Sequence, residues 1–91
     1  MFLSYYAVFY KENNEFWIKV PDLSGCFSYG EDFITAREMG KKAIELYLDG
    51  IDIEKLPFKS SLEDIYETQG ELVLIDVEME VKDGKLCCKG N

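Results

Sequence analysis

Residues 21–30, which read PDLSGCFSYG, constrain the fold of this chain more than any other segment. A proline, an aspartate and two glycines within ten residues are typical of a connection between regular elements. Proline cannot donate a hydrogen bond to a strand ladder, so Pro21 ends the extended segment before it. The connection therefore predicts sheet on its N-terminal side and, a little further on, a helix. The residues expected to shape it are Pro21, Asp22, Leu23, Gly25, Cys26 and Gly30.

Two strands are predicted before this connection. Residues 2–10 are almost entirely apolar or aromatic, so we expect a strand that is covered on much of both faces. Residues 16–20 form the return strand, with Phe16, Ile18 and Val20 on one face. The polar stretch between the strands contains two asparagines, which tolerate left-handed backbone, and it predicts a hairpin.

A third strand and one helix are predicted after the connection. The third strand covers about residues 26–29 and is closed by Gly30. The helix covers about residues 32–49, with Asp32 as a plausible N-cap and Gly50 at its C-terminal end. Apolar or small residues recur along the helix at three- and four-residue spacing, and these are Phe33, Ala36, Gly40, Ala43, Ile44, Tyr47, Leu48 and Ile51.

The clearest strand of the chain is predicted at residues 71–81. Five apolar residues there are expected to face the core, namely Val73, Ile75, Val77, Met79 and Val81. Asp76, Glu78 and Glu80 alternate with them on the opposite face. A hairpin signal follows at residues 82–85, and residues 86–88 either add a short last strand or fray.

The segment between the helix and this strand is less regular. Leu56, Pro57 and Phe58 are expected to hold a connection against the body of the protein. A short helical turn can begin at Ser60 or Ser61. The 91 residues thus predict one small domain with the order β-β-β-α-β. Its fold class is α+β, with one mainly antiparallel sheet packed against one principal helix.

The charge of the chain restricts its partners. The formal net charge is −8, whereas nucleic-acid affinity comes mostly from lysine and arginine, so direct DNA or RNA binding is disfavoured. An acidic surface suits a basic protein partner through electrostatic steering. The alternative is that the charge only keeps a small protein soluble.

The cysteines and the termini indicate the compartment. The chain has three cysteines, no histidine, no signal peptide and no apolar stretch long enough to span a membrane. We therefore expect reduced thiols in the cytoplasm and neither a metal site nor a cofactor. Cys26 is interpreted as a small buried hydrophobe rather than a nucleophile.

The chain resembles the HicB antitoxin family over roughly residues 5–81. The resemblance rests on the run from Trp17 through Pro21, Asp22 and Leu23 to Cys26, placed one strand ahead of a helix that contains AIELYLDG. It implies a partial ribonuclease H-like fold that has lost catalysis. It also implies an antitoxin that binds and inhibits a HicA-like toxin, a small basic ribonuclease that cleaves messenger RNA. Many members carry a C-terminal DNA-binding module, which has no counterpart in this sequence, so operator binding is not expected.

A metal-dependent nuclease is the enzymatic alternative. Such a site needs several carboxylates around two metal ions. The resemblance to a ribonuclease H-like fold implies that one of them belongs in the middle of the first strand. The first strand has no acid between Tyr5 and Tyr10, while Glu38 or Glu45 and Asp76 supply only two. We therefore expect no catalytic residues and interpret these acids as solvated surface.

The residues expected to contact a partner are aromatic or acidic, and they are Trp17, Asp22, Tyr29, Glu31, Asp76 and Glu78. Trp17 has two interpretations. It packs on the outer face of the sheet against Tyr5 or Phe9, or it anchors a partner. Asp22 either bonds to amides of its own turn or meets a basic partner.

A binding module of another class is the main alternative to the antitoxin. The aromatic content and the exposed strand edges would suit a stand-alone oligomer, a dimer or tetramer, with an unknown ligand.

Overall fold

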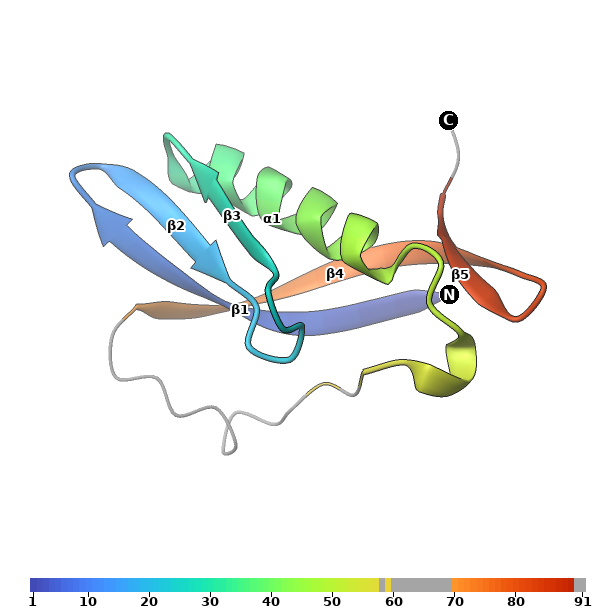
Figure 1. Cartoon of the computed structure of the whole chain (residues 1–91). Helices are drawn as coiled ribbons and strands as arrows, with labels where there is room; N and C mark the ends of the chain where they lie inside the picture. The colour runs from blue at the N-terminus through green and yellow to red at the C-terminus, as the bar shows by residue number, and fades with distance from the viewer. Residues whose placement is uncertain (58, 60–69, 90–91) are drawn as a thin grey trace.

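The computed structural model describes residues 1–57, 59 and 70–89. Its strands are β1 (Phe2–Glu12), β2 (Glu15–Lys19), β3 (Phe27–Gly30), β4 (Glu71–Lys82) and β5 (Lys85–Cys88). The principal helix is α1 (Phe33–Leu48), and a short 3-10 helix, η1 (Ile53–Lys55), follows it (Figure 1). The segment that was expected either to fray or to form a last strand therefore forms β5.

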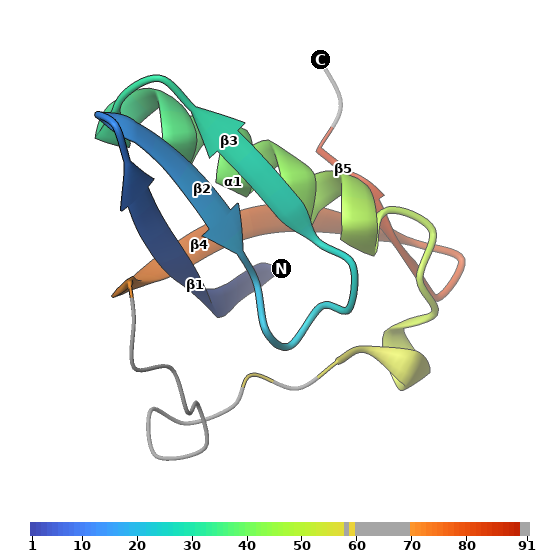
Figure 2. The same ribbon diagram turned by 60° about the vertical axis from the view of Figure 1, so that its left-hand side comes forward.

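The five strands make one curled sheet in the order β3-β2-β1-β4-β5, and every neighbouring pair is antiparallel. Helix α1 lies across one face of this sheet, and the views of Figures 1 and 2 agree on this arrangement. The α+β prediction, with one antiparallel sheet and one principal helix, is confirmed. No helix within the described part of the chain is long and apolar enough to cross a membrane.

The core lies between α1 and the sheet. β1 contributes Tyr5, Ala7 and Phe9, and the Phe9 and Phe33 rings pack with centroids 5.0 Å apart. The buried helix residues are Ala36, Gly40, Ile44 and Leu48, as the three- and four-residue spacing predicts. Alternation along β4 is confirmed for Ile75, Val77 and Met79, which are all 1% exposed.

Val81 is the exception on β4. We expected it in the core, but it is 45% exposed. Its partner across the ladder is Leu86, in the hairpin that closes the end of the sheet. Near a hairpin end a side chain has neighbours from only two strands, so less of its surface is covered.

Two tight turns set the register of the sheet. Asn13 and Asn14 both have left-handed backbone, with φ of 51° and 73°, as a two-residue hairpin loop requires. This short loop lets β1 run two residues past its predicted end and pairs Glu12 with Glu15. Asp83 and Gly84 repeat the geometry between β4 and β5.

The connection after β2 is held by backbone hydrogen bonds. The Leu23 amide donates to the Val20 carbonyl at 3.0 Å, and the Cys26 amide donates to the Leu23 carbonyl at 2.9 Å. Leu23 is fully buried and Cys26 is 5% exposed, so both turn the connection into the core. Burial raises the pKa of the Cys26 thiol, which fits its interpretation as a buried hydrophobe.

Asp32 begins the helix, as predicted. Its Oδ1 accepts a hydrogen bond from the Thr35 amide at 2.7 Å, and this bond holds the pKa of the carboxyl below its usual value. A carboxyl with a lowered folded-state pKa stabilises the protein above its unfolded pKa of about 3.9 and loses this contribution as the pH falls.

We therefore expect Asp32→Ala to lower the melting temperature by several degrees at pH 7. The difference from the wild type should shrink at pH 3, because the wild-type carboxyl is then increasingly protonated. Thermal denaturation followed by circular dichroism measures both values. Glu38→Ala, on the exposed side of α1, is the control and should cause little change. An equal Asp32→Ala difference at both pH values would contradict a role for the ionised cap.

The connection after η1 is attached to β1 through one side chain. The Tyr5 hydroxyl donates to the Pro57 carbonyl oxygen at 2.7 Å, and Leu56 packs against the core. This agrees with the expectation that Leu56 and Pro57 hold the connection against the body. Phe58 and the predicted turn at Ser60 or Ser61 lie outside the described residues.

Tyr5→Phe should remove only this hydrogen bond, because the ring of residue 5 is kept. We expect the free energy of unfolding to fall by about 1 kcal/mol. Urea denaturation measures it, and Tyr47→Phe, with a half-buried ring on α1, is the control. Unchanged stability would show that the Pro57 contact contributes nothing to folding.

Candidate protein-interaction surface

An aromatic row crosses the sheet face opposite α1. The ladder places Tyr10 opposite Trp17 and Trp17 opposite Tyr29, so the three side chains lie side by side on β1, β2 and β3. The Trp17 and Tyr29 rings have centroids 4.9 Å apart and an interplanar angle of 52°. Trp17 has the largest side chain of the protein, and 49% of its surface is exposed. We call Tyr10, Trp17 and Tyr29 the aromatic row.

The position of Trp17 corrects one expectation. One of the two interpretations placed Trp17 against Tyr5 or Phe9, but both lie in the core on the helix side of the sheet. The two-residue loop at Asn13 and Asn14 pairs Trp17 with Tyr10 instead. The loop predicted at residues 11–15 was too long to give this pairing, whereas a two-residue loop at the adjacent asparagines implies it. The other interpretation, that Trp17 anchors a partner, stays a prediction.

Acidic residues border the aromatic row. A hydrogen bond to Glu15 raises the pKa of the Tyr29 hydroxyl, and partial burial and the charge of Glu31 raise it further. The Tyr29 hydroxyl is the donor of this hydrogen bond and the Glu15 carboxylate is the acceptor. Glu15 was missed as a site residue in the sequence, where it looked like part of a polar loop.

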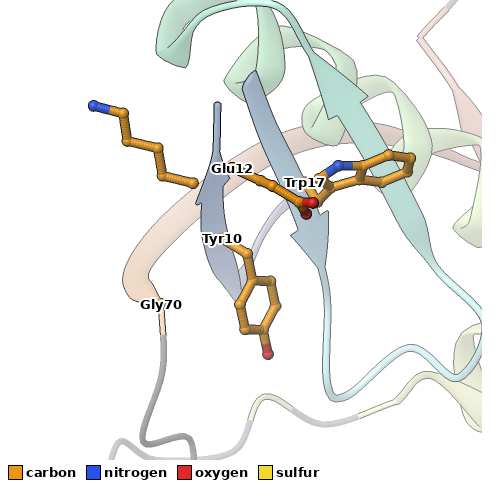
Figure 3. A pocket seen from close by; sticks show the side chains of 5 residues that line it. Tyr10, Glu12, Trp17 and Gly70 are labelled. Carbon is orange, nitrogen blue, oxygen red and sulfur yellow. The ribbon is translucent and has the colours of Figure 1, made fainter. Parts of the chain in front are cut away.

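A hollow of about 440 Å³ lies beside the row. It is lined by Tyr10, Lys11, Glu12, Trp17 and Gly70. Figure 3 shows the side chains of Tyr10, Glu12 and Trp17 around it. The lining therefore combines two aromatic rings with one acidic and one basic side chain, Glu12 and Lys11.

The remaining predicted contact residues lie elsewhere. Asp76 accepts a hydrogen bond from the Ser4 hydroxyl, and Glu78 pairs with Lys89, which lowers the pKa of Glu78. Ser4 is six residues from Tyr10 along β1, so Asp76 lies about 20 Å from the aromatic row.

Asp22 lies in the turn after β2, away from the row. Burial is the main cause of the raised pKa of Tyr5, and the negative charge of Asp22 adds to it. The predicted contact set therefore splits into three places, and only Trp17, Tyr29 and Glu31 gather at one of them.

Two of the acids considered for a nuclease do come together. Glu38 and Asp76 line a hollow of about 180 Å³ with Arg37, Lys41 and Ile75. The described residues contain no group of three or more side chains suited to holding a metal ion. The two carboxylates share their hollow with two cations.

The family model described as HicB-like antitoxin of bacterial toxin–antitoxin systems matches residues 5–86. The chain belongs to this HicB-like antitoxin family. The match extends from the middle of β1 into β5, so it covers the aromatic row and the whole of α1.

Two relatives are similar to this HicB-like chain. A UPF0150 protein of Helicobacter pylori (strain J99) is 41% identical over 54 residues, which are 59% of this chain and 75% of the relative. An uncharacterized 14.9 kDa protein from the rep-hol intergenic region of Haemophilus phage HP1 is 33% identical over 82 residues. That alignment covers 82% of this chain and 61% of the phage protein, so the chain spans less than two thirds of that relative.

Proposed function

We propose that this HicB-like protein is a cytoplasmic antitoxin that binds and inhibits a small basic HicA-type ribonuclease. Membership of the family supports a toxin as the partner. The aromatic row supports the choice of surface, because exposed tryptophan and tyrosine supply much of the binding energy in protein interfaces. The net charge of −8 supports a basic partner.

The geometry suggests how inhibition works. The Trp17 and Tyr29 rings support each other, so little side-chain freedom is lost when a partner covers them. Glu12, Glu15 and Glu31 around the row offer carboxylates to lysine or arginine side chains that would otherwise contact RNA phosphates. Binding here is steric and electrostatic occlusion of an RNA-binding surface, and the antitoxin has a regulatory role without catalysis of its own.

Asp22, Asp76 and Glu78 take a smaller part in this proposal. They lie away from the row, and Asp76 and Glu78 already have partners in Ser4 and Lys89. We propose that they contribute long-range attraction to a basic toxin and little contact energy.

The direct test mixes the purified protein with the small basic protein encoded beside it. Isothermal titration calorimetry measures the affinity, and cleavage of a messenger RNA by the neighbour measures inhibition. We expect a complex, inhibition in proportion to its formation, and weaker binding at high salt. No binding, or binding without inhibition, would contradict the antitoxin role.

A stand-alone oligomeric binding module remains the second candidate. It is favoured by the exposure of Phe27, which is 63% exposed at the outer strand of the sheet. Co-purification of the protein with copies of itself and no neighbour would favour this candidate. Two further predictions remain. One is that residues 1–91 form a single domain. The other is that the chain does not bind DNA, which an operator-binding assay tests.

A further inference from the structure

β4 extends well beyond the strand that covers its outer side. β5 pairs with residues 79–82 of β4, whereas β1 pairs with residues 71–78 on the other side. Within the described part of the chain, no strand lies on the outer side of residues 71–78, and Figure 1 shows β4 running on past β5. We call this outer side the β4 edge. An unpaired strand edge is a place where an extended peptide can add to a sheet.

The hydrogen bonds of the N-terminus show which backbone groups point out from the β4 edge. The Met1 ammonium donates to the Met79 carbonyl at 2.9 Å, and the Met79 amide donates to the Met1 carbonyl at 2.8 Å. Because bonded pairs alternate along an antiparallel ladder, Val73, Ile75 and Val77 bond inward to β1. The N–H and C=O groups of the residues between them point outward, and these residues are Leu72, Leu74, Asp76 and Glu78.

At the opposite end of the sheet, β5 is covered by its own chain. The Gly50 amide donates to the Leu86 carbonyl at 2.7 Å, and the Leu86 amide donates to the Ile51 carbonyl at 2.9 Å. The Ile53 amide donates to the Gly84 carbonyl at 2.9 Å. The backbone after α1 thus occupies the edge that β5 would otherwise present, while no backbone hydrogen bond from another described segment reaches the β4 edge.

The side chains of the β4 edge change from apolar to acidic along the strand. On the sheet face opposite α1, Leu72 and Leu74 are followed by Asp76 and Glu78. Leu74 is 38% exposed, and Val73 on the helix side is only partly buried although it packs against the core. A strand added at this edge would cover both side chains. The edge therefore suits a strand that carries apolar side chains at one end and a cation at the other.

Lys89 shows which side chain the acidic end accepts. Met79 pairs with Cys88, so Lys89 follows in register opposite Glu78, and its Nζ bonds to the Glu78 carboxylate. The next outward-pointing residue along the edge is Asp76, which lines the hollow of about 180 Å³ beside α1. A second lysine, two residues further along the same path, would meet Asp76 in the same way.

The acids of the β4 edge also select among strands that could pair with it. Residues 71–78 contain neither a lysine nor a proline, the residues that most often block edge pairing. The acids and the net charge of −8 repel a second copy of this chain, whereas they attract a basic segment. The edge is therefore better matched to a strand of opposite charge than to its own copy.

We infer that the β4 edge binds an extended, lysine-bearing segment of a partner protein as an added antiparallel strand. The segment continues the path of β5 beyond Lys89. On the face opposite α1 it places a lysine opposite Asp76 and apolar side chains opposite Leu74 and Leu72. Each of these pairs exchanges both hydrogen bonds, because the backbone groups of these three β4 residues point outward. Asp76 lies about 20 Å from the aromatic row, so the inference holds whether or not that row binds a toxin.

Fluorescence anisotropy of a labelled peptide, titrated with the whole protein, tests the inference. The peptide Thr-Lys-Thr-Val-Thr-Val-Thr places its lysine opposite Asp76 and its valines opposite Leu74 and Leu72. We expect saturable binding with a Kd of about 1 mM or less, and Asp76→Lys should weaken it by about tenfold or more. Glu54→Lys is the matched control, because it changes the net charge equally but lies exposed in η1, away from the β4 edge. No saturable binding, or equal binding by the two lysine variants, would overturn the inference.

Reversing the charge on both sides tests the register. A peptide with glutamate in place of its lysine should bind the Asp76→Lys variant about tenfold more tightly than it binds the wild type. Circular dichroism shows that each protein variant is folded. A glutamate peptide that binds both proteins equally would contradict the pairing with Asp76. A wild-type dimer that the lysine peptide dissociates in sedimentation would assign the edge to a second copy and overturn the inference.

N-methylation of the peptide tests whether it binds as a strand. A methyl group on the amide of the valine opposite Leu74 removes an N–H that donates to β4, so binding should weaken by about tenfold or more. The amide of the next threonine, opposite Val73, points away from β4, and its N-methylation should change the affinity little. Equal losses for the two methylated peptides would show that the peptide does not extend the sheet.

Discussion

Replacing Gly30 by alanine is expected to destabilise the protein strongly and to lower its melting temperature. A Cβ atom at this position would lie 2.3 Å from the Ala36 amide nitrogen and 2.4 Å from its Cα. Both atoms belong to the backbone of the first turns of α1, so neither can rotate away. We expect a loss of about 3 kcal/mol or more in the free energy of unfolding, and a melting temperature lower by roughly 15 °C.

Gly40→Ala is the matched control for this experiment. Its Cβ would meet the ends of two flexible side chains, Ile18 Cδ1 at 3.0 Å and Ile75 Cδ1 at 3.4 Å. Alanine also favours the helix over glycine by about 1 kcal/mol, so the net change should be small. Urea denaturation measures both variants. Equal stabilities for Gly30→Ala and the wild type would show that β3 and α1 do not approach each other so closely.

Replacing Trp17 by alanine is expected to abolish most of the binding to the proposed toxin partner. This change removes the largest exposed aromatic surface of the row together with the ring that supports Tyr29. Truncation of a central aromatic anchor typically costs 2 kcal/mol or more, so we expect the affinity to fall by about 30-fold or more. Titration calorimetry against the toxin measures the change.

Leu46→Ala is the control for Trp17. Leu46 is 70% exposed on α1, which lies on the other face of the sheet. It should leave toxin affinity unchanged, and melting curves should show that both variants are folded. If Trp17→Ala binds as tightly as the wild type, the aromatic row is not the interface. The antitoxin proposal itself would then still depend on whether the wild-type protein binds and inhibits the toxin.

Local features of the fold were predictable from the sequence. The N-cap at Asp32, the buried stripe of α1 and the turn at Asp83 and Gly84 depend on side chains only a few positions apart. Their pattern therefore appears directly in the sequence. The likeness to a partial ribonuclease H fold rests on the family resemblance and stays a prediction.

The neighbours of Trp17 were predicted wrongly, although its face was predicted correctly. Alternation with Phe16 and Ile18 places Trp17 on the face away from the helix. The residue beside it depends on the register of two strands, and the predicted loop was too long to specify that register. A loop of only two residues decided it.

The sequence alone determined the order of the first four strands and the principal helix, the ends of that helix and the alternation of faces along the strands. These properties depend on backbone preferences and on burial patterns that repeat every few residues. Only the tertiary structure decided which residues meet. β1 pairs with β4 across about 70 residues of chain, and the same pairing carries Asp76 away from the aromatic row. The close approach of Gly30 to Ala36 and the covered edge of β5 follow from the same assembled packing.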